Sequence, residues 1–508
     1  MHFLKLQKVP FRTGLVMIAL LWGGLVPARA QHRGDNLAFQ GMEAYNRSGV
    51  QAVARGGAMT AVSGQLEALY WNPAGLVGLQ GLQFFINSGQ YDTEWWERQD
   101  YRPNRQLVTM SFILDGLYRP NPEYNGWLDN EAFFADSNYV VKEPVLGKDG
   151  YDKNAADWRK GLSGTGALNI AAGLPFSLLS KSWAVAIGYN HNIPVTDYDR
   201  NQTNLVPHPA FTGYGDLPDR VTSAEDSVRI YWSDYQRQRQ GTLDEWQGAI
   251  AFALNRNLQF GIRLRHNSGS TDESQTLNRI GYFDLVQGIQ IFRFSYDTLD
   301  VNISGTSKFS STRFAIGGIA QFENFSLGVN VVLPHTLSRE WHLTTSEEGP
   351  QRSTKHPDTG VDEMRVPLSF SAGLKLQPVA SFSLSFDIEH QPYSKAEFHF
   401  ARTDSTHRPW VDQTTYRLGL EFKPWNVLSL LAGYRSVPQV FVPDGAENGR
   451  RAPRADVFAY GLSLNLWRLR FDMAYEVTRL RYYDVYFSNT NWAANQDSHL
   501  MFGVTFNY

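Results

Sequence analysis

The hydrophobic pattern of this chain is that of β-strands, with apolar side chains at every second position. At the C-terminus, one strand face carries Leu500, Phe502, Val504, Phe506 and Tyr508, and small or polar residues occupy the other face. Side chains in a strand alternate between faces, so this segment presents one apolar and one polar surface. An edge strand of a soluble sandwich has the same pattern, so the segment alone leaves both folds open.

The same alternation recurs along most of the chain, and charged residues are confined to the polar face. Such segments cover residues 258–264, 325–333, 366–376, 382–388, 416–422, 458–466 and 469–477. In the last of them, Arg470, Asp472 and Glu476 all lie opposite the aromatic and aliphatic residues. A strand that crosses a membrane within a barrel shows an apolar face to lipid and a polar face to the lumen. The repetition therefore predicts a transmembrane β-barrel.

Short connections predict the turns at one end of this barrel. They lie at residues 176–181, 255–257, 323–324, 377–381, 423–426 and 467–468. These turns join twelve strands, and a first strand from Leu82 to Gly89 and a last strand from His499 bring the number to fourteen. An even number returns both ends of a bacterial barrel to the same side of the membrane. The predicted fold is an all-β, 14-stranded antiparallel transmembrane β-barrel.

Longer segments between the hairpins are predicted to be extracellular loops. They span residues 90–163, 193–243, 267–312, 344–364, 393–411, 438–455 and 482–497. Aromatic clusters on exposed loops often mark binding sites. The candidate capture residues are Trp95, Trp96, Phe133, Phe134, Phe292 and Phe294. Loop packing and the interfacial aromatic girdles would explain the same residues without a ligand. Alternating patches at residues 107–113 and 291–296 are candidates for strands that extend above the membrane or add to the count.

The first thirty residues have the organisation of a secretory signal peptide. Basic residues precede an apolar run from Gly14 to Val26, and Ala28-Arg29-Ala30 fits a cleavage site. This run is too short for a comfortable helical span, and no later segment approaches roughly 20 continuous apolar residues. We predict an exported chain whose mature form begins at Gln31.

The composition excludes several classes of function. The chain has no cysteine, which excludes disulfides and every cysteine-based metal or nucleophile site. Its 47 basic and 50 acidic residues give a net charge of −3, without the basic surface that nucleic acid requires. Ser498 and His499 are adjacent on a strand and face opposite ways, and no hydrolase or phosphate-binding motif appears. We predict no enzymatic activity, metal or cofactor.

Charged residues on the predicted lumen faces form a separate group of candidates. They are Arg263, Arg265, Lys375, Asp387, Glu389, Arg417, Glu421, Arg435, Arg470, Asp472 and Glu476. Such residues could bind the carboxylate of a ligand. Acidic and basic members occur on neighbouring strands, which favours a mutually neutralising network that ties the N-terminal segment to the wall.

About fifty residues before the first strand do not alternate. Residues 54–62 read Ala-Arg-Gly-Gly-Ala-Met-Thr-Ala-Val, and residues 68–76 read Ala-Leu-Tyr-Trp-Asn-Pro-Ala-Gly-Leu. Gly56 and Gly57 permit close backbone approach, while Pro73 fixes its own φ. A barrel of this size has a lumen that is either open to water or filled. We predict a signal peptide at residues 1–30, a lumen-filling hatch at 31–80 and the barrel at 81–508.

These two motifs resemble the hatch of the FadL/TodX family, outer-membrane transporters of long-chain fatty acids and aromatic hydrocarbons. The resemblance covers residues 54–76 and includes the family's Asn-Pro-Ala motif at Asn72, Pro73 and Ala74. It implies an outer-membrane barrel, in contact with membrane lipid, that takes up hydrophobic small molecules passively. A ligand would pass from the loops to a pocket against the hatch and leave sideways into the outer leaflet. The C-terminal aromatic residue resembles the signal read by the barrel-assembly machinery.

The mature N-terminus departs from the family pattern. In the fatty-acid transporters this segment is apolar and lines the lipid pocket, whereas here residues 31–36 are polar and Leu37 and Phe39 are the first large apolar residues. Either the pocket is built differently or the ligand is not a simple fatty acid. The same motif also resembles PorV-like barrels of protein secretion and surface attachment, so that function remains an alternative. A hatch-like segment argues against an open diffusion porin.

Overall fold

The structure is a computed structural model that describes residues 37–42, 47–101, 150–208, 228–285, 293–350, 352–402, 410–443, 451–486 and 489–508. The predicted signal peptide and the candidate residues Phe133, Phe134 and Phe292 lie outside these ranges. Within them, no helix is long and apolar enough to cross a membrane.

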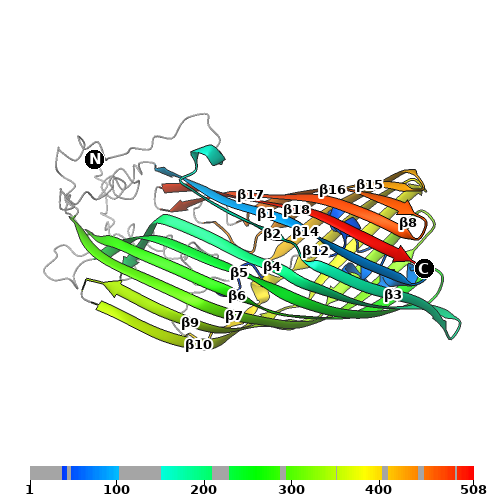
Figure 1. The fold of residues 1–508 in the computed structure, drawn as a ribbon, viewed down its shortest axis with the longest axis horizontal. Helices are drawn as coiled ribbons and strands as arrows, with labels where there is room; N and C mark the ends of the chain where they lie inside the picture. The colour runs from blue at the N-terminus through cyan, green and yellow to red at the C-terminus, as the bar shows by residue number, and fades with distance from the viewer. Residues whose placement is uncertain are drawn as a thin grey trace, which may run out of the picture.

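The described strands form one closed antiparallel sheet that surrounds a lumen (Figure 1). In chain order they are β1 (Gln83–Tyr101), β2 (Trp158–Thr165), β3 (Leu168–Leu178), β4 (Lys181–His208), β5 (Val228–Ala253), β6 (Leu258–Leu285), β7 (Arg293–Gln321), β8 (Phe325–Val332), β9 (His335–Gly349), β10 (Arg352–Val366), β11 (Ser369–Val379), β12 (Phe382–Gln391), β13 (Glu397–His399), β14 (Gln413–Trp425), β15 (Leu428–Pro438), β16 (Arg454–Leu466), β17 (Leu469–Tyr486) and β18 (Asn489–Asn507). The helical elements are α2 (Val50–Ala54), α3 (Ala68–Trp71), η1 (Pro73–Gly78), η3 (Lys153–Ala155) and η6 (Tyr393–Lys395).

The wall of the described barrel has fourteen strands because four of them are interrupted. β2 and β3 both pair with β1, and β8 and β9 both pair with β7, so each of these two pairs is one interrupted wall strand. β10 and β11 pair with β9 and β8, and β13 and β12 pair with β10 and β11, so they form the other two interrupted strands. The barrel closes between β1 and β18, which pair from Gln83–Asn507 to Tyr101–Asn489. All the predicted short turns connect consecutive strands, so the predicted 14-stranded antiparallel barrel is confirmed.

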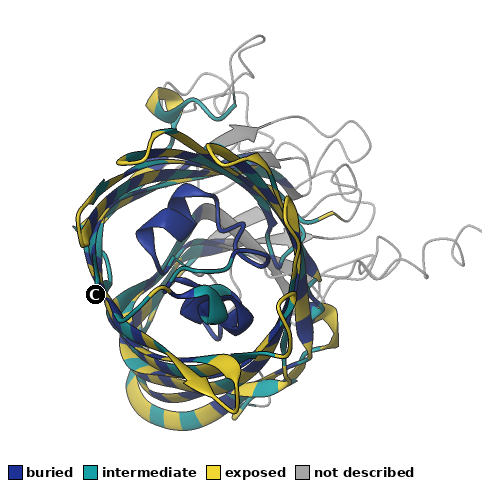
Figure 2. Ribbon diagram, turned by 90° about the vertical axis from the view of Figure 1, so that its right-hand side faces the viewer, coloured by how far each residue is buried: buried dark blue, intermediate teal, exposed yellow. Residues whose placement is uncertain are grey.

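Residues 47–80, called the lumen segment below, lie inside the barrel (Figure 2). α2 contacts β15 to β18, and η1 contacts β3 to β7, so the segment touches opposite sides of the wall. Figure 1 shows it in the half of the barrel that ends at the short turns and the C-terminus. Most of its side chains are buried, including Met59, Leu66, Leu69 and Tyr70.

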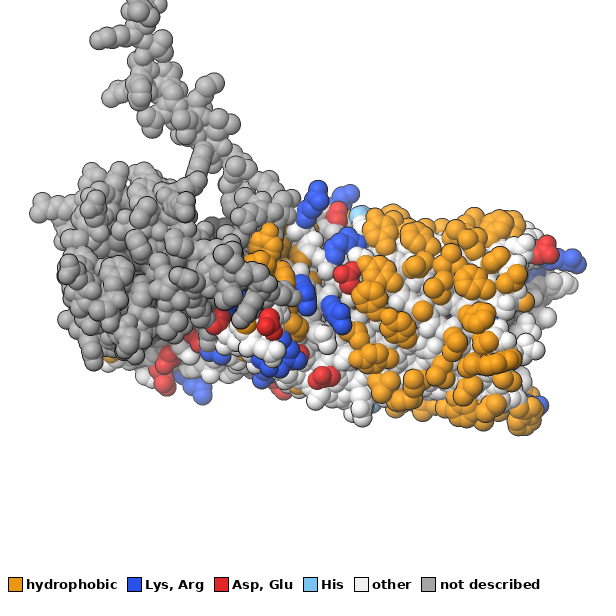
Figure 3. Space-filling model, turned by 90° about the horizontal axis from the view of Figure 1, so that it is seen from above, with side chains coloured by type: hydrophobic (Ala, Val, Ile, Leu, Met, Phe, Trp, Pro, Cys, Tyr) orange, Lys and Arg blue, Asp and Glu red, His pale blue; other side chains and the backbone are white. Residues whose placement is uncertain are grey.

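Exposed apolar side chains on strands all round the wall form a belt on the same half of the barrel, and Figure 3 shows one face of it. On β18, Phe502 is 54% exposed and faces outward, whereas Met501 and Thr505 are buried and face the lumen. This is the predicted alternation. Aromatic residues mark both borders of the belt, with Trp467 and Tyr508 near the short turns and Trp246 and Tyr475 toward the long loops.

The strands extend far beyond this belt, and the predicted boundaries of several loops were wrong. β4, β5, β6 and β7 contain 28, 26, 28 and 29 residues, whereas a tilted crossing takes about 9 to 11. Much of residues 193–243 and 267–312 is therefore strand. Above the belt the outward face of these strands is largely polar, so the outward apolar positions that mark a membrane strand disappear while the backbone ladder continues.

The same error affects the aromatic capture residues. Trp95 and Trp96 lie on β1, paired with β18, and not on a loop. Trp96 is 6% exposed, and its indole N–H donates to the carbonyl oxygen of Tyr151 at 3.0 Å. Phe294 lies on β7 opposite Phe283 of β6. Polar neighbours were interpreted as loop sequence, but they occupy ladder positions of the extended wall.

Candidate functional site

Asn72 forms side-chain hydrogen bonds both within the lumen segment and to the barrel wall. Its side chain is fully buried, and its amide nitrogen donates to the carbonyl oxygens of Thr60 at 2.6 Å and Val329 at 3.2 Å. Its amide oxygen accepts from the N–H of Ala74 at 3.1 Å and so caps η1, in which Pro73 is the first residue. Pro lacks an N–H and is favoured at this position, which explains why Asn-Pro-Ala begins the helix.

Glycines in the lumen segment and in the barrel wall allow the two to pack closely together. Gly56 and Gly57 have φ values of 64° and 81°, a region that favours glycine. A Cβ on Gly56 would lie 2.9 Å from the backbone of Tyr434 in β15. On the wall, a Cβ on Gly317 would lie 1.9 Å from the side-chain oxygen of Asn72. Larger residues at these positions would displace the lumen segment.

Several of the predicted lumen charges bind the lumen segment. Arg55 pairs with Glu421 at 2.9 Å, and Glu67 pairs with Arg470 at 2.7 Å. The carboxylate of Asp387 accepts from the backbone N–H groups of residues 59 and 60, each at 2.8 Å. For these residues the structure favours the neutralising network over a ligand role.

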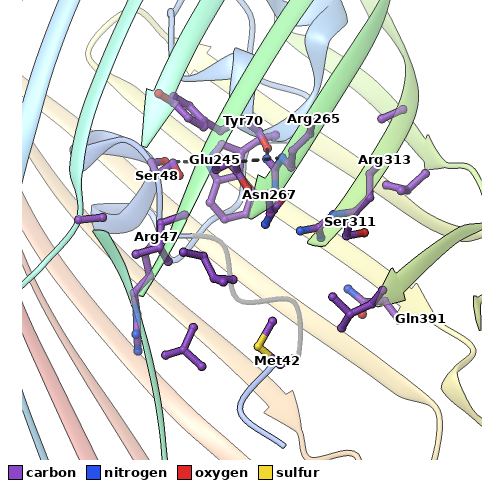
Figure 4. A pocket seen from close by; sticks show the side chains of 18 of the residues that line it. Met42, Arg47, Ser48, Tyr70, Glu245, Arg265, Asn267, Ser311, Arg313 and Gln391 are labelled. Carbon is purple, nitrogen blue, oxygen red and sulfur yellow. Dashed lines mark hydrogen bonds and ion pairs between the residues drawn. The ribbon is translucent and has the colours of Figure 1, made fainter. Parts of the chain in front are cut away.

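A cavity of about 260 Å³ lies in the lumen beside this segment (Figure 4). One side of the cavity is apolar and includes Leu243, Phe309, Leu337, Met364 and Val366. These side chains belong to a buried cluster that also contains Phe39 and Trp410. The sequence did not indicate this side, because Leu243, Phe309 and Met364 lie in predicted loops and the five residues come from segments far apart along the chain.

The other side of the cavity is cationic. Arg263 and Arg265 of β6 and Arg313 of β7 line it, and Figure 4 shows Arg265 and Asn267 close to Tyr70 and Glu245. Arg265 lies 3.5 Å from the carboxylate of Glu245 and donates to the carbonyl of Tyr70 at 3.0 Å. Within the described ranges, neither Arg263 nor Arg313 forms an ion pair with a carboxylate. Among the described residues, Arg263 donates to the carbonyl of Leu69, at 3.0 Å.

Buried polar atoms on this side have hydrogen-bonding capacity that the described protein atoms leave unused. They include Nε of Arg313, Oδ1 of Asn267 and Oγ of Ser311. A buried polar group without a partner costs about 1–3 kcal/mol. An anionic group of a ligand in the cavity could accept hydrogen bonds from Nε of Arg313 and Oγ of Ser311, whereas Oδ1 of Asn267 needs a donor.

The cavity reaches the barrel wall where the second wall strand is interrupted. Gly166 and Ala167, between β2 and β3, line it together with Gly89 and Gln90 of β1. β3 pairs with β4, but β2 pairs only with β1 among the described residues. In the described portion of the chain, the upper part of β4 therefore has no backbone partner on its β2 side, which leaves an unpaired gap in the described wall.

A bulge in β4 accompanies this gap. The register between β4 and β5 shifts between Asn190 and Ile193, and Asn192 has a φ of 56°. Farther from the belt, the rings of Trp158 and Tyr198 lie 5.4 Å apart, so side chains link β2 and β4 there. Trp95 also contacts this position, at 6.0 Å from the ring of Tyr198. The predicted capture residue thus packs beside the gap.

No protein-family model and no curated protein matches the sequence. Solved structures do match the fold. A Pseudomonas aeruginosa FadL homologue aligns with a TM-score of 0.56 and 12% identity, over 91% of this chain and 99% of that chain. The Pseudomonas putida toluene transporter TodX aligns with a TM-score of 0.55 and 12% identity, over 91% and 98% of the two chains.

The monoaromatic hydrocarbon channel CymD aligns at a TM-score of 0.50 and 11% identity, over 92% of this chain and 99% of that chain. The chain has the FadL/TodX-type barrel fold. The resemblance predicted from residues 54–76 is confirmed for the fold. TodX is described as a toluene transporter and CymD as a monoaromatic hydrocarbon channel.

Proposed function

We propose that this protein is an outer-membrane channel for the passive uptake of hydrophobic molecules with an acidic head group, such as long-chain fatty acids. The observation that carries the proposal is the two-sided cavity. Its apolar side, with Leu243, Phe309 and Met364, matches a hydrocarbon chain, and its arginine side matches a carboxylate.

The pairing of the cavity charges favours an anion over a neutral hydrocarbon. Arg265 is paired with Glu245, and Arg417 is paired with Glu389. Arg263 and Arg313 lack a carboxylate partner within the described residues. A carboxylate would supply the missing countercharge, whereas a neutral hydrocarbon would leave both guanidinium groups uncompensated.

The exit proposed for the ligand is the gap between β2 and the upper part of β4. The lumen segment occupies the direct route through the barrel, and the cavity meets the wall at Gly166 and Ala167. Release at this position would bring an apolar ligand into lipid without crossing the polar lumen. Under this proposal the lumen segment acts as a hatch.

The test measures the affinity of the purified protein for oleate and for oleyl alcohol, which has the same chain without the carboxylate. Arg313→Gln is compared with Lys308→Gln, a matched change at an exposed position of the same strand. A hydrogen bond to a charged group contributes about 1.5–3 kcal/mol. We expect Arg313→Gln to weaken oleate binding by about 10-fold or more and to leave oleyl alcohol binding unchanged.

If Arg313→Gln weakened the binding of oleate and oleyl alcohol equally, or did not weaken oleate binding, the proposed role of Arg313 in binding the carboxylate would be contradicted. The alternative function in protein secretion requires a loop surface that holds a protein. No observation on the described residues favours it.

A further inference from the structure

Exposed arginines border the apolar belt on β16 and β17. On β17 the outward side chains change from Tyr475 to Arg479 and Arg481, and on β16 they change from Phe458 to Arg454. Figure 3 shows basic side chains along this border, on the side of the belt toward the long loops. This border is the level at which lipid head groups meet a barrel.

Arg454 is held in place by the barrel itself. Its Nε donates to the hydroxyl of Ser436 at 2.8 Å, and its Nη2 donates to the carbonyls of Thr414 at 3.1 Å and Ser436 at 3.2 Å. Its guanidinium carbon lies 5.5 Å from the ring centroid of Tyr416. Nη1 makes no hydrogen bond to a described residue, so this fixed cation keeps donors for an external group.

The strand register gathers positive charge at this border. Ala455 of β16 pairs with Leu480 of β17, so the next two residues, Arg454 and Arg481, lie opposite each other and both face outward. Like charges on adjacent strands destabilise a sheet. Among the described outward residues of β16 and β17 at this border, the one acidic residue is Asp456, which lies opposite Arg479 and accepts from the hydroxyl of Tyr434 at 2.6 Å. The cluster therefore suits an anion that bridges several guanidinium groups.

We propose that Arg454, Arg479 and Arg481 bind the phosphate groups of a phosphorylated glycolipid in the outer leaflet. Guanidinium groups bind phosphate through paired hydrogen bonds, and a basic residue at an anionic membrane surface contributes about 1 kcal/mol. The aromatic residues directly below, including Tyr416 and Tyr475, would contact the start of the acyl chains. This inference rests on the proposed membrane location but not on the cavity or its ligand.

The test uses the full-length protein purified in detergent and measures lipid A binding by native mass spectrometry. The double variant Arg454→Gln/Arg481→Gln is compared with Arg468→Gln. Arg468 is a matched control because it lies at the opposite border of the belt, 4.9 Å from the ring of Tyr508. Removing two arginines should weaken lipid A binding about 25-fold, at about fivefold for each residue. The control should bind like the wild type.

A second arm uses lipid A from which both phosphates have been removed. We expect the wild type to bind it about as weakly as the double variant binds intact lipid A. Equal lipid A binding by the wild type and the double variant would overturn the proposal, as would equal binding of the dephosphorylated lipid. Oleate binding, measured in parallel, should not change in the double variant, so failure here is distinct from failure of the proposed function.

Discussion

Asn72 joins three parts of the molecule through one side chain. It connects the turn at Thr60, the start of η1 at Ala74 and strand β8 at Val329. Its importance could be predicted only from the resemblance of the Asn-Pro-Ala motif. The contact with Val329 spans 257 residues, and no local pattern indicates which wall strand would receive the amide.

Asn72→Ala should loosen the lumen segment without unfolding the barrel. The substitution leaves the buried carbonyl of Thr60 without this donor, at a cost of about 1–3 kcal/mol, and it removes the tie to the carbonyl of Val329. We expect faster hydrogen exchange over residues 59–74 and an unchanged barrel in heat-modifiability gels. Gln240→Ala, at an exposed position of β5 away from the cavity, is the control. Unchanged exchange in Asn72→Ala would contradict the anchoring role.

The buried ion pairs of Glu273, above the belt, should make the stability of the barrel depend on pH. Glu273 is buried between Arg239, at 2.7 Å, and Arg339. Burial alone would raise the pKa of Glu273, but the two arginines hold it below its ordinary value. A carboxyl whose folded pKa is lowered stabilises the fold above its unfolded pKa, and that stability is lost as the pH falls through the folded pKa.

The contribution of Glu273 to thermal stability should therefore be constant from neutral pH down to about pH 4.5 and should decrease in stronger acid. Glu273→Gln should lower the unfolding free energy at pH 7 by about 3 kcal/mol, because it breaks a buried pair, and should flatten the acid dependence. Glu340→Gln, at an exposed position of β9, should leave the profile unchanged. Identical acid profiles for Glu273→Gln and the wild type would contradict this account.

At the level of elements, β4 shows why the boundaries of strands were harder to predict than their existence. The predicted loop begins at Ile193, between Asn192 and Pro194, which are residue types that also favour turns. In the structure it forms a bulge, and the strand resumes at Ile193 and continues to His208. Turns and bulges use the same residue types, and the polar strand beyond the bulge carries no hydrophobic alternation.

Asp244 of β5 fixes this bulge. Its carboxylate accepts from the backbone N–H of Asn192 at 3.0 Å and from the hydroxyl of Tyr189 at 3.1 Å, and it lies 2.9 Å from Nδ1 of His191. Asp244→Ala should release the bulge and lower fatty-acid uptake several-fold, because the unpaired gap beside β4 would change shape. Asp456→Asn, which also removes an outward carboxylate near the belt, should take up ligand normally. Normal uptake by Asp244→Ala would argue against a role of the bulge in release.

For the whole molecule, the membrane-facing surface was predictable and the interior site was not. The outward direction of residues such as Phe502 and Phe471 can be predicted from alternation, because every strand that crosses a membrane has an apolar face toward lipid. The cavity follows no such rule. Phe309 and Arg313 lie only four positions apart on β7, yet they line its apolar and cationic sides. Their roles emerge only when the neighbouring strands and the lumen segment are in place.

The filled lumen leads to a prediction for the molecule as a whole. A barrel of fourteen strands has an interior wide enough for water unless something fills it, and here the lumen segment does so. The intact protein should therefore show little ion conductance in planar bilayers, whereas deletion of residues 47–80 should produce a stable open channel. Asn72→Ala, which keeps the segment, should stay close to the wild type on average and open only briefly. Comparable steady conductance in the intact protein and the deletion variant would mean that the segment does not seal the lumen, and the lateral route for ligands would lose its main physical reason.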